Sequence, residues 1–265
     1  MADVYTLGVD VGSTTSKCLI LKNGSEIAAS ALVPAGTGTS GPGRALAAAL
    51  SEAGLAREDL AAVTATGYGR ASFDCGADFT VSELSCHALG AAALLPGVRT
   101  VVDIGGQDAK VLRIGSGGRL ESFLMNDKCA AGTGRFLEVM ARVLEKDVSE
   151  LAEMDAKAAG RVNISSTCTV FAESEVISQL AKNVDLHDLV AGIHASVAVR
   201  TAGLARRLGV TEPVGMTGGV AQNAGVVRAL ERELGVRIAV SPLSQLAGAY
   251  GAAICGWNKT GRDSD

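Results

Sequence analysis

Two cysteines of this chain lie in polar segments whose composition is unusual for core packing. Cys129 lies in residues 126–136 (NDKCAAGTGRF) and Cys168 in residues 165–175 (SSTCTVFAESE). Each segment leads into a predicted helix, whose first N–H groups and positive dipole end stabilise an anionic sulfur ligand. Two thiolates do not complete a cubane iron–sulfur cluster, which takes four, whereas a twofold dimer would supply four. The alternative is that both cysteines are small buried hydrophobic residues.

A second pattern occurs twice and has the residue types of a phosphate-binding turn. The segments DVGSTTSK from Asp10 and DIGGQDAK from Asp103 share aspartate, glycine two residues on and lysine seven residues on. Each follows an apolar strand and precedes another, so we interpret them as an internal repeat. Glycine lets backbone N–H groups approach an anion, and aspartate can hold Mg²⁺ or its water shell. The catalytic candidates are Asp10, Asp103 and Gln107, of which Gln107 would orient the attacking water.

A third glycine pair, Gly218-Gly219, follows a predicted strand and runs into a helix. Its N–H groups and helix dipole suit an anion or a sugar–adenine edge. For any one such loop the alternative is an ordinary strand–helix turn, but three loops, two of them repeated, favour binding. The candidate cofactor-binding residues are the following glycine, hydroxyl, amide and lysine residues: Gly12, Ser13, Thr14, Thr15, Ser16, Lys17, Gly105, Gly106, Gly132, Gly134, Gly218, Gly219, Gln222, Asn223 and Gln245.

Composition limits the class of protein. Of 265 residues, 48% are hydrophobic and 20% charged, which supports a sizeable core and excludes intrinsic disorder. The net charge of −4 does not indicate a nucleic-acid-binding face. No apolar run approaches the ~20 residues of a membrane helix, and the N-terminus lacks the pattern of a secretory signal. We therefore expect a cytoplasmic protein with reduced cysteines, and interpret the remaining four as structural: Cys18, Cys75, Cys86 and Cys255.

The order of the predicted elements supports the repeat. Strands are expected at residues 5–10, 16–21, 26–33, 61–65, 100–104, 214–217 and 237–240. Helices are expected at residues 44–53, 83–94, 134–144, 173–183, 186–208, 223–234 and 246–257. A duplicated α/β protein is the simplest interpretation, with a first domain at 1–96 and a second at 97–265.

The three loops resemble the phosphate-1, phosphate-2 and adenosine motifs of the actin, sugar-kinase and Hsp70 (ASKHA) superfamily over about residues 4–256. The resemblance implies two ribonuclease-H-like domains with ATP and Mg²⁺ in a nucleotide cleft. The fold leaves the reaction open, because kinases, chaperones and filament proteins share it.

The two cysteine segments resemble the signature segments of the BadF/BadG/BcrA/BcrD ATPase family. The segments at 37–42 (TGTSGP), 65–70 (ATGYGR) and 82–87 (SELSCH) are also similar to that family. The resemblance implies a homodimer holding one oxygen-sensitive [4Fe-4S] cluster, ligated by Cys129 and Cys168 of each subunit. It further implies ATP-driven transfer of one electron, supplied by ferredoxin or flavodoxin, to a 2-hydroxyacyl-CoA dehydratase of amino-acid fermentation. The first expectation for that dehydratase is the one that acts on (R)-2-hydroxyglutaryl-CoA.

Other functions remain open from the residues alone. Within the same reading, the acceptor is another 2-hydroxyacyl-CoA dehydratase or a double-cubane cluster reductase. One alternative is a small-molecule kinase, which would use Asp103 as its base and have structural cysteines. Another is a non-enzymatic regulatory ATPase module such as a nucleotide sensor. Iron content separates the electron-transferring ATPase from the kinase and the sensor.

Overall fold

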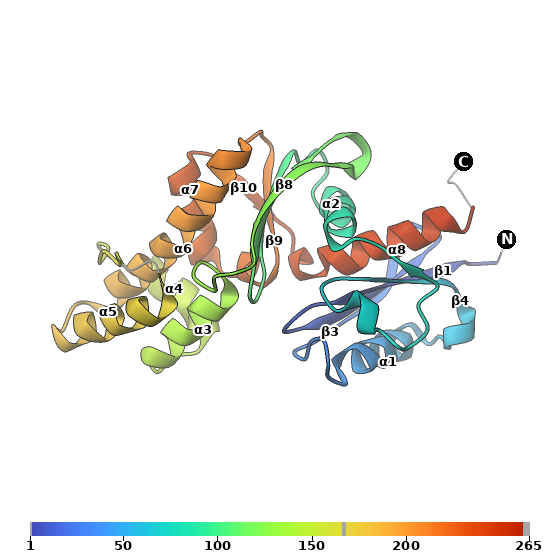
Figure 1. Cartoon of the computed structure of the whole chain (residues 1–265), viewed down its shortest axis with the longest axis horizontal. Coiled ribbons are helices and arrows are strands. Elements are labelled where there is room, and N and C mark those ends of the chain that lie inside the picture. The colour runs from blue at the N-terminus through green and yellow to red at the C-terminus, as the bar shows by residue number, and fades with distance from the viewer. Residues whose placement is uncertain (1, 166–167, 262–265) are drawn as a thin grey trace. The chain divides into compact units, whose positions relative to one another are not determined.

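The computed structural model describes residues 2–165 and 168–261 (Figure 1). Ser166 and Thr167, within the second cysteine segment, lie outside the described residues. The chain groups into two compact units. The first contains residues 1–97, 114–121 and 243–265, and the second contains residues 98–113 and 122–242. The expected division into domains at residues 96 and 97 stays a prediction, because these units regroup two later segments with the first.

The first unit contains a five-stranded sheet with the order β3-β2-β1-β4-β5. Strand β1 pairs antiparallel with β2 and parallel with β4. Helix α1 packs on β2 and β3, while α8 packs on β1 and β4 and carries α2, so the two groups of helices cover opposite faces (Figure 1). The elements are β1 (Tyr5–Val11), β2 (Ser16–Lys22), β3 (Glu26–Val33), β4 (Leu60–Thr66), β5 (Phe79–Thr80), α1 (Gly41–Ala53), α2 (Glu83–Leu94) and α8 (Ala247–Lys259).

The second unit repeats this arrangement in a sheet with the order β10-β9-β6-β7-β8. Strand β6 pairs antiparallel with β7 and parallel with β9, as β1 pairs with β2 and β4. The predicted internal repeat is therefore a repeat of strand order and direction. The elements are β6 (Thr100–Ile104), β7 (Ala109–Ile114), β8 (Leu120–Asn126), β9 (Val214–Thr217), β10 (Ile238–Val240), α3 (Gly134–Val143), α4 (Leu151–Ala156), α5 (Thr169–Ala181), α6 (Leu186–Leu208) and α7 (Ala224–Leu234).

Short 3-10 helices connect these elements. They are η1 (Arg57–Asp59), η2 (Arg70–Ser72), η3 (Ser116–Gly118), η4 (Val148–Glu150), η5 (Gly219–Gln222) and η6 (Ser244–Leu246). Within the described residues, no helix combines the length and apolar character needed to cross a membrane.

Helix α5 begins earlier than its sequence indicates. The sequence predicts its start at Glu173, whereas the structure begins it at Thr169, directly after Cys168. The first turn contains Thr169, Val170 and Phe171, which have modest helix propensity. The local sequence therefore does not indicate that this turn is helical. Tertiary packing overrides that propensity, because Ala172 at the end of this turn is fully buried in the core of the second unit.

Glycines let the backbones of α2 and α8 touch. A Cβ atom added to Gly251 of α8 would lie 1.7 Å from the carbonyl oxygen of Cys86 in α2. One added to Gly90 of α2 would lie 1.8 Å from the carbonyl oxygen of Ala247 in α8. Side chains at either position would force the helices apart, so the glycines set the distance between them.

This packing predicts opposite effects for two Gly→Ala substitutions. Gly251→Ala must separate α8 from α2, and we expect it to lower the free energy of unfolding by about 3 kcal/mol. Gly203→Ala in α6 meets open space and removes a helix-destabilising glycine, so it should raise the free energy of unfolding by up to about 1 kcal/mol. Chemical denaturation followed by circular dichroism measures both. Equal stability of Gly251→Ala and the wild type would contradict the backbone contact.

Candidate functional site

The first aspartate–glycine turn is a hairpin in which the aspartate faces the lysine. Asp10 at the end of β1 lies in register with Lys17 of β2, and their side chains form an ion pair at 3.2 Å. The Gly12 N–H donates to the carbonyl of Thr15 at 3.0 Å and closes the turn. Asp10 is crowded from a second side, because a Cβ at Gly67 would lie 2.4 Å from its Oδ1. The spacing of seven residues between aspartate and lysine is thus the register of a hairpin with a four-residue loop.

The second turn has the same register, but its ion pair is more deeply buried. Asp103 lies opposite Lys110, their side chains pair at 3.2 Å, and each is 4% exposed. Lys110 also pairs with Asp108, and Thr217 of β9 donates its hydroxyl to Asp103 Oδ1 at 3.1 Å. The Gly105 N–H donates to the carbonyl of Asp108 at 2.9 Å, as Gly12 does to Thr15.

The structure separates the predicted loop residues into exposed and engaged side chains. Ser13 and Gln107 are exposed, so their polar groups can meet a ligand or water. Ser16 is fully buried and donates its hydroxyl to the carbonyl of Ala35 at 2.7 Å. Lys17, a candidate cofactor-binding residue, forms its ion pair with Asp10. Thr14 and Thr15 of the first turn are half-buried, as are Gly106 of the second turn and Gln245 in η6.

The third loop connects β9 with α7 through two tight positions. Gly218 has φ +84°, and a Cβ there would lie 2.3 Å from the carbonyl oxygen of Ile104. Gly219 begins η5, in which Gln222 is exposed and reaches the carbonyl of Pro242 at 3.5 Å. Asn223 then caps α7, its Oδ1 accepting the N–H groups of Gly225 and Val226. The loop is therefore rigid at both ends.

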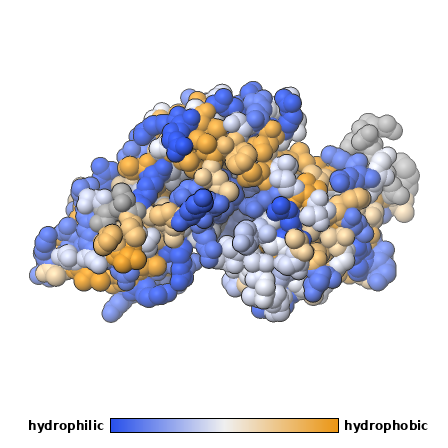
Figure 2. Space-filling view, in the orientation of Figure 1, coloured by the Kyte–Doolittle hydropathy of each residue, from blue (hydrophilic) through white to orange (hydrophobic). Residues whose placement is uncertain are grey.

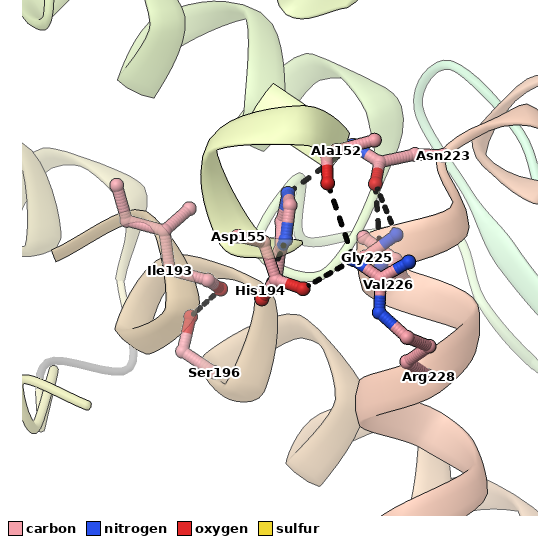
Figure 3. A network of polar contacts seen from close by, with 9 residues as sticks. All are labelled: Ala152, Asp155, Ile193, His194, Ser196, Asn223, Gly225, Val226 and Arg228. Atoms are coloured by element: carbon pink, nitrogen blue, oxygen red, sulfur yellow. Dashed lines mark hydrogen bonds and ion pairs between the residues drawn. The ribbon is translucent and has the colours of Figure 1, made fainter. Parts of the chain in front are cut away.

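A buried polar network continues from Asn223 into the core (Figure 3). Because Asn223 Oδ1 is occupied by the cap, its Nδ2 faces His194 Nε2 at 3.2 Å and donates to it. On the other side of the ring, His194 Nδ1 lies 3.3 Å from Asp155 Oδ1. Arg228 of α7 donates to the other oxygen of Asp155 at 2.7 Å. Burial acts to raise the pKa of Asp155, but the contacts with His194 and Arg228 together hold it below its ordinary value.

The loop that carries Cys129 is hydrogen-bonded to the second turn. The N–H groups of Gly134 and Arg135, in the first turn of α3, donate to the carbonyls of Gly105 and Gly106 at 2.9 Å and 2.8 Å. A Cβ at Gly134 would lie 3.1 Å from the Gly105 carbonyl oxygen, so glycine permits this approach. These two N–H groups therefore already have acceptors, and the expected stabilisation of the Cys129 sulfur by the positive end of the helix dipole stays a prediction.

Cys129 and Cys168 are both exposed, and both act on one arginine. Burial lowers the pKa of Arg200 in α6, while the charges of Cys129 and Cys168 act in the opposite direction. The Arg200 guanidinium lies 5.8 Å from the centre of the Phe136 ring, and a Cβ at Gly132 would lie 3.5 Å from the Arg200 side chain. Two cysteines 39 positions apart in the chain therefore lie near enough to one cation for their charges to act on it.

The residues that the sequence analysis missed are those that connect the predicted ones. Arg200 carries no local signal, because arginines are common on helices. His194 and Asp155 belong to separate helices, so no local sequence pattern pairs them. His194 is fully buried.

The Asp155 network gives a prediction for stability and its pH dependence. Asp155→Asn should lower the free energy of unfolding by about 3 kcal/mol, because His194 and Arg228 lose a charged partner in the core. The native pKa of Asp155 is lowered, so this contribution is complete above its ordinary value of 3.8 and is lost as the pH falls through the native value. The difference between the variant and the wild type should therefore shrink in acid.

The control for Asp155→Asn is on the same helix. Glu153 pairs with Lys157 on the exposed side of α4, so Glu153→Gln should leave the denaturation midpoint unchanged. Denaturation curves at pH 7 and pH 3 measure both variants. A difference for Asp155→Asn that is the same at both pH values would exclude the charged form of Asp155 as its source.

Sequence comparison matches residues 7–256 to the BadF/BadG/BcrA/BcrD ATPase family. The chain is 60% identical over 259 residues to the (R)-2-hydroxyglutaryl-CoA dehydratase activating ATPase of Acidaminococcus fermentans, covering 98% of this chain and 99% of the relative. The crystal structure of component A of that dehydratase superposes with a TM-score of 0.95, covering 98% of this chain and 100% of the other.

A second solved structure contains a nucleotide analogue. It is the activator of the 2-hydroxyisocaproyl-CoA dehydratase from Clostridium difficile with bound ADPNP, with a TM-score of 0.94 and 53% identity over 99% of this chain and 100% of the other. A glucokinase of the ROK family from Streptomyces griseus has a TM-score of 0.59 at 17% identity, covering 96% of this chain and 99% of that one. That likeness shows the fold alone, and it agrees with the expected ASKHA architecture. With its match spanning nearly all of the sequence, this chain belongs to the BadF/BadG/BcrA/BcrD ATPase family.

Proposed function

We propose that this protein is an ATP-dependent activator of a 2-hydroxyacyl-CoA dehydratase and delivers one low-potential electron to it. One observation carries the proposal: Cys129 and Cys168 are both exposed, and their charges act on the same arginine in a chain 60% identical to a dehydratase-activating ATPase. That relative makes (R)-2-hydroxyglutaryl-CoA dehydratase the first partner to test. Other 2-hydroxyacyl-CoA dehydratases and a double-cubane cluster reductase are the alternative electron acceptors.

The two cysteines fit half of the ligand set of a [4Fe-4S] cluster. Among the described residues, no three His, Cys, Asp or Glu side chains converge as a metal site within one chain. We therefore assign the other two thiolates to Cys129 and Cys168 of a second copy, so that a homodimer holds one cluster. The cluster, when bound, supplies a single electron at low potential.

The surface beside Cys168 supports a contact with another protein chain. Val170 and Phe171, in the first turn of α5, are 65% and 68% exposed, and Ile177 two turns later is 52% exposed. Figure 2 shows apolar atoms among hydrophilic ones over the α5 region. Covering such side chains removes apolar area from water, which stabilises the contact by roughly 25 cal/mol per Å² of buried apolar surface. A second copy seated there would bring its own cysteines to the same place.

The nucleotide contacts are assigned to the two hairpin turns and the third loop. The backbone N–H group of Gly106 and the hydroxyl groups of Ser13, Thr14 and Thr15 would bind phosphate oxygens, while Gly12 closes the first turn through its bond to Thr15. Asp10 and Asp103 would hold Mg²⁺ through its water shell, and Gln107 would orient the attacking water. Gly218, Gly219, Gln222 and Gln245 would contact the sugar and the base.

The link from nucleotide to cysteine runs through α3. Gly105 and Gly106 hold the N–H groups of the first turn of this helix, and the Cys129 loop is continuous with that turn. A shift of the second turn on ATP binding or hydrolysis therefore moves the start of α3 and Cys129 with it. A tenfold change in a one-electron equilibrium corresponds to about 59 mV, or roughly 1.4 kcal/mol, so a low-potential transfer needs this outside source of free energy. Ferredoxin or flavodoxin would re-reduce the protein.

The first test is the iron and sulfide content of the dimer after anaerobic purification. We expect about four iron and four sulfide per dimer, absorbance that bleaches in air, and ATP-dependent electron transfer to (R)-2-hydroxyglutaryl-CoA dehydratase. Cys129→Ala and Cys168→Ala should each abolish the iron content. Cys75→Ala, a half-buried cysteine of the first unit, should retain it. Iron-free protein that still binds ATP would overturn the electron-transfer proposal and favour a kinase or a nucleotide sensor.

The second test concerns Arg200. Its positive charge beside both cysteines should stabilise the reduced, more negative state, so Arg200→Gln should lower the midpoint potential by about 50 mV, or roughly 1 kcal/mol. Arg200→Lys keeps the charge and should restore most of the potential. Arg206→Gln, an exposed position on the same helix, should leave it unchanged. A redox titration followed by electron paramagnetic resonance measures each variant, and equal potentials for Arg200→Gln and the wild type would remove Arg200 from this role.

A further inference from the structure

Two cysteines of the first unit, distant in sequence and unused by the proposed function, face each other across α2 and α8. Cys86 of α2 and Cys255 of α8 are joined by a hydrogen bond between their sulfur atoms. The contact follows from the glycine crossing of these helices. Cys86 lies one helical turn before Gly90, and Cys255 lies one turn after Gly251. Since the backbones touch at the glycines, the side chains one turn away come within reach.

The surroundings make the two sulfurs unequal. The hydrogen bond from Cys86 lowers the pKa of Cys255 to about 7 against the effect of burial, and the charge of Lys259 acts in the same direction as the bond. The same bond, together with burial and the charge of Asp10, raises the pKa of Cys86 far above its ordinary range, although a hydrogen bond with Thr66 opposes this. Cys255 is half-buried and open to small solutes, whereas Cys86 is fully buried.

We infer that Cys255 and Cys86 form an oxidation site, in which hydrogen peroxide converts the pair to a disulfide that ties α2 to α8. The geometry on which this rests is the sulfur–sulfur hydrogen bond, the backbone contact at Gly90 and Gly251, and the difference in exposure between the two thiols. A solvent-accessible thiol of low pKa beside a resolving cysteine is the arrangement of redox-sensing cysteines, and half-buried Cys255 beside Cys86 has that arrangement. The site is independent of Cys129 and Cys168, which belong to the other unit.

The reaction takes two steps and needs one molecule of peroxide. The Cys255 thiolate attacks one peroxide oxygen, the O–O bond breaks and hydroxide leaves, which gives a sulfenic acid at Cys255. The Cys86 sulfur then attacks the Cys255 sulfur, the S–S bond forms and the S–O bond breaks. The Cys86 proton and the leaving hydroxide are released as water. The hydroxide from the first step takes up the proton that the Cys255 thiol released on ionisation. The two cysteines lose two electrons in all, and peroxide is reduced to two molecules of water.

The other thiols of this unit lack that combination. Cys18 is fully buried, and burial raises its pKa. Cys75 is half-buried, but its pKa is raised by burial and by a hydrogen bond with Asp74. We therefore expect oxidation to select Cys255 over both.

Peptide mapping of the full-length protein tests the inference. Anaerobically purified wild type and Cys129→Ala are treated with stoichiometric peroxide, alkylated and digested with trypsin and a glutamate-specific protease, which cuts after Glu83 and separates Cys75 from Cys86. Mass spectrometry without reductant should find the peptides of Cys86 and Cys255 linked in both proteins, and a reductant should release them. Cys129→Ala keeps the result independent of sulfide or iron released from any cluster.

Two variants complete the test. Cys86→Ser keeps a hydrogen-bond donor but removes the resolving sulfur, so Cys255 should accumulate as sulfenic acid that dimedone traps. Cys75→Ser should form the Cys86–Cys255 link as the wild type does. A wild-type protein with no such link, or with links spread equally over Cys18 and Cys75, would overturn the inference even if Cys86→Ser failed to fold.

Discussion

The two hydrogen bonds from the first turn of α3 to the carbonyls of Gly105 and Gly106 determine how the second unit is organised. A helix N-terminus normally leaves its first N–H groups for a capping side chain, water or an anion. Here they join the helix to the tip of a β-hairpin, and Gly134 permits the approach. The Cys129 loop therefore has its place fixed by the hairpin that carries Gln107. The hairpin tip is bonded to the first turn of α3, and the Cys129 loop leads directly into that turn.

The two hairpins show how one sequence pattern acquires different properties after duplication. In both, the aspartate and the lysine seven residues on are cross-strand neighbours, and glycine closes the turn. The pair Asp10–Lys17 stays partly accessible, whereas Asp103–Lys110 is almost wholly buried and has gained Asp108 and Thr217 as partners. Buried ion pairs need such additional partners to offset the loss of solvation. The second copy is thus the more rigid support, and it is the copy that holds α3.

Sequence reasoning reaches the elements whose signals are local. The apolar strands, the repeated turns and the long helix α6 are readable from periodicity and glycine placement, and the family follows from the cysteine segments. The early start of α5, the short α4 and strand β8 are not, because their residues gain their conformation from packing in the tertiary structure. Arg200 and the pairing of Asp155 with His194 are beyond a local reading for the same reason. These contacts depend on which helices pack against one another, and no local pattern in a single sequence indicates that packing.

The return of the chain to its first unit has a consequence for the order of folding. Strand β2 buries Leu19 and Leu21 against Leu246, Ala249 and Ala253, and Gly8 of β1 lies against the α8 backbone. During synthesis these strands leave the ribosome well before α8, which follows the whole of the second unit. One face of the first sheet thus remains without its helix while the second unit is being made, and the second unit can reach its native state first. The nascent chain therefore depends on its later part to protect its earlier part from aggregation.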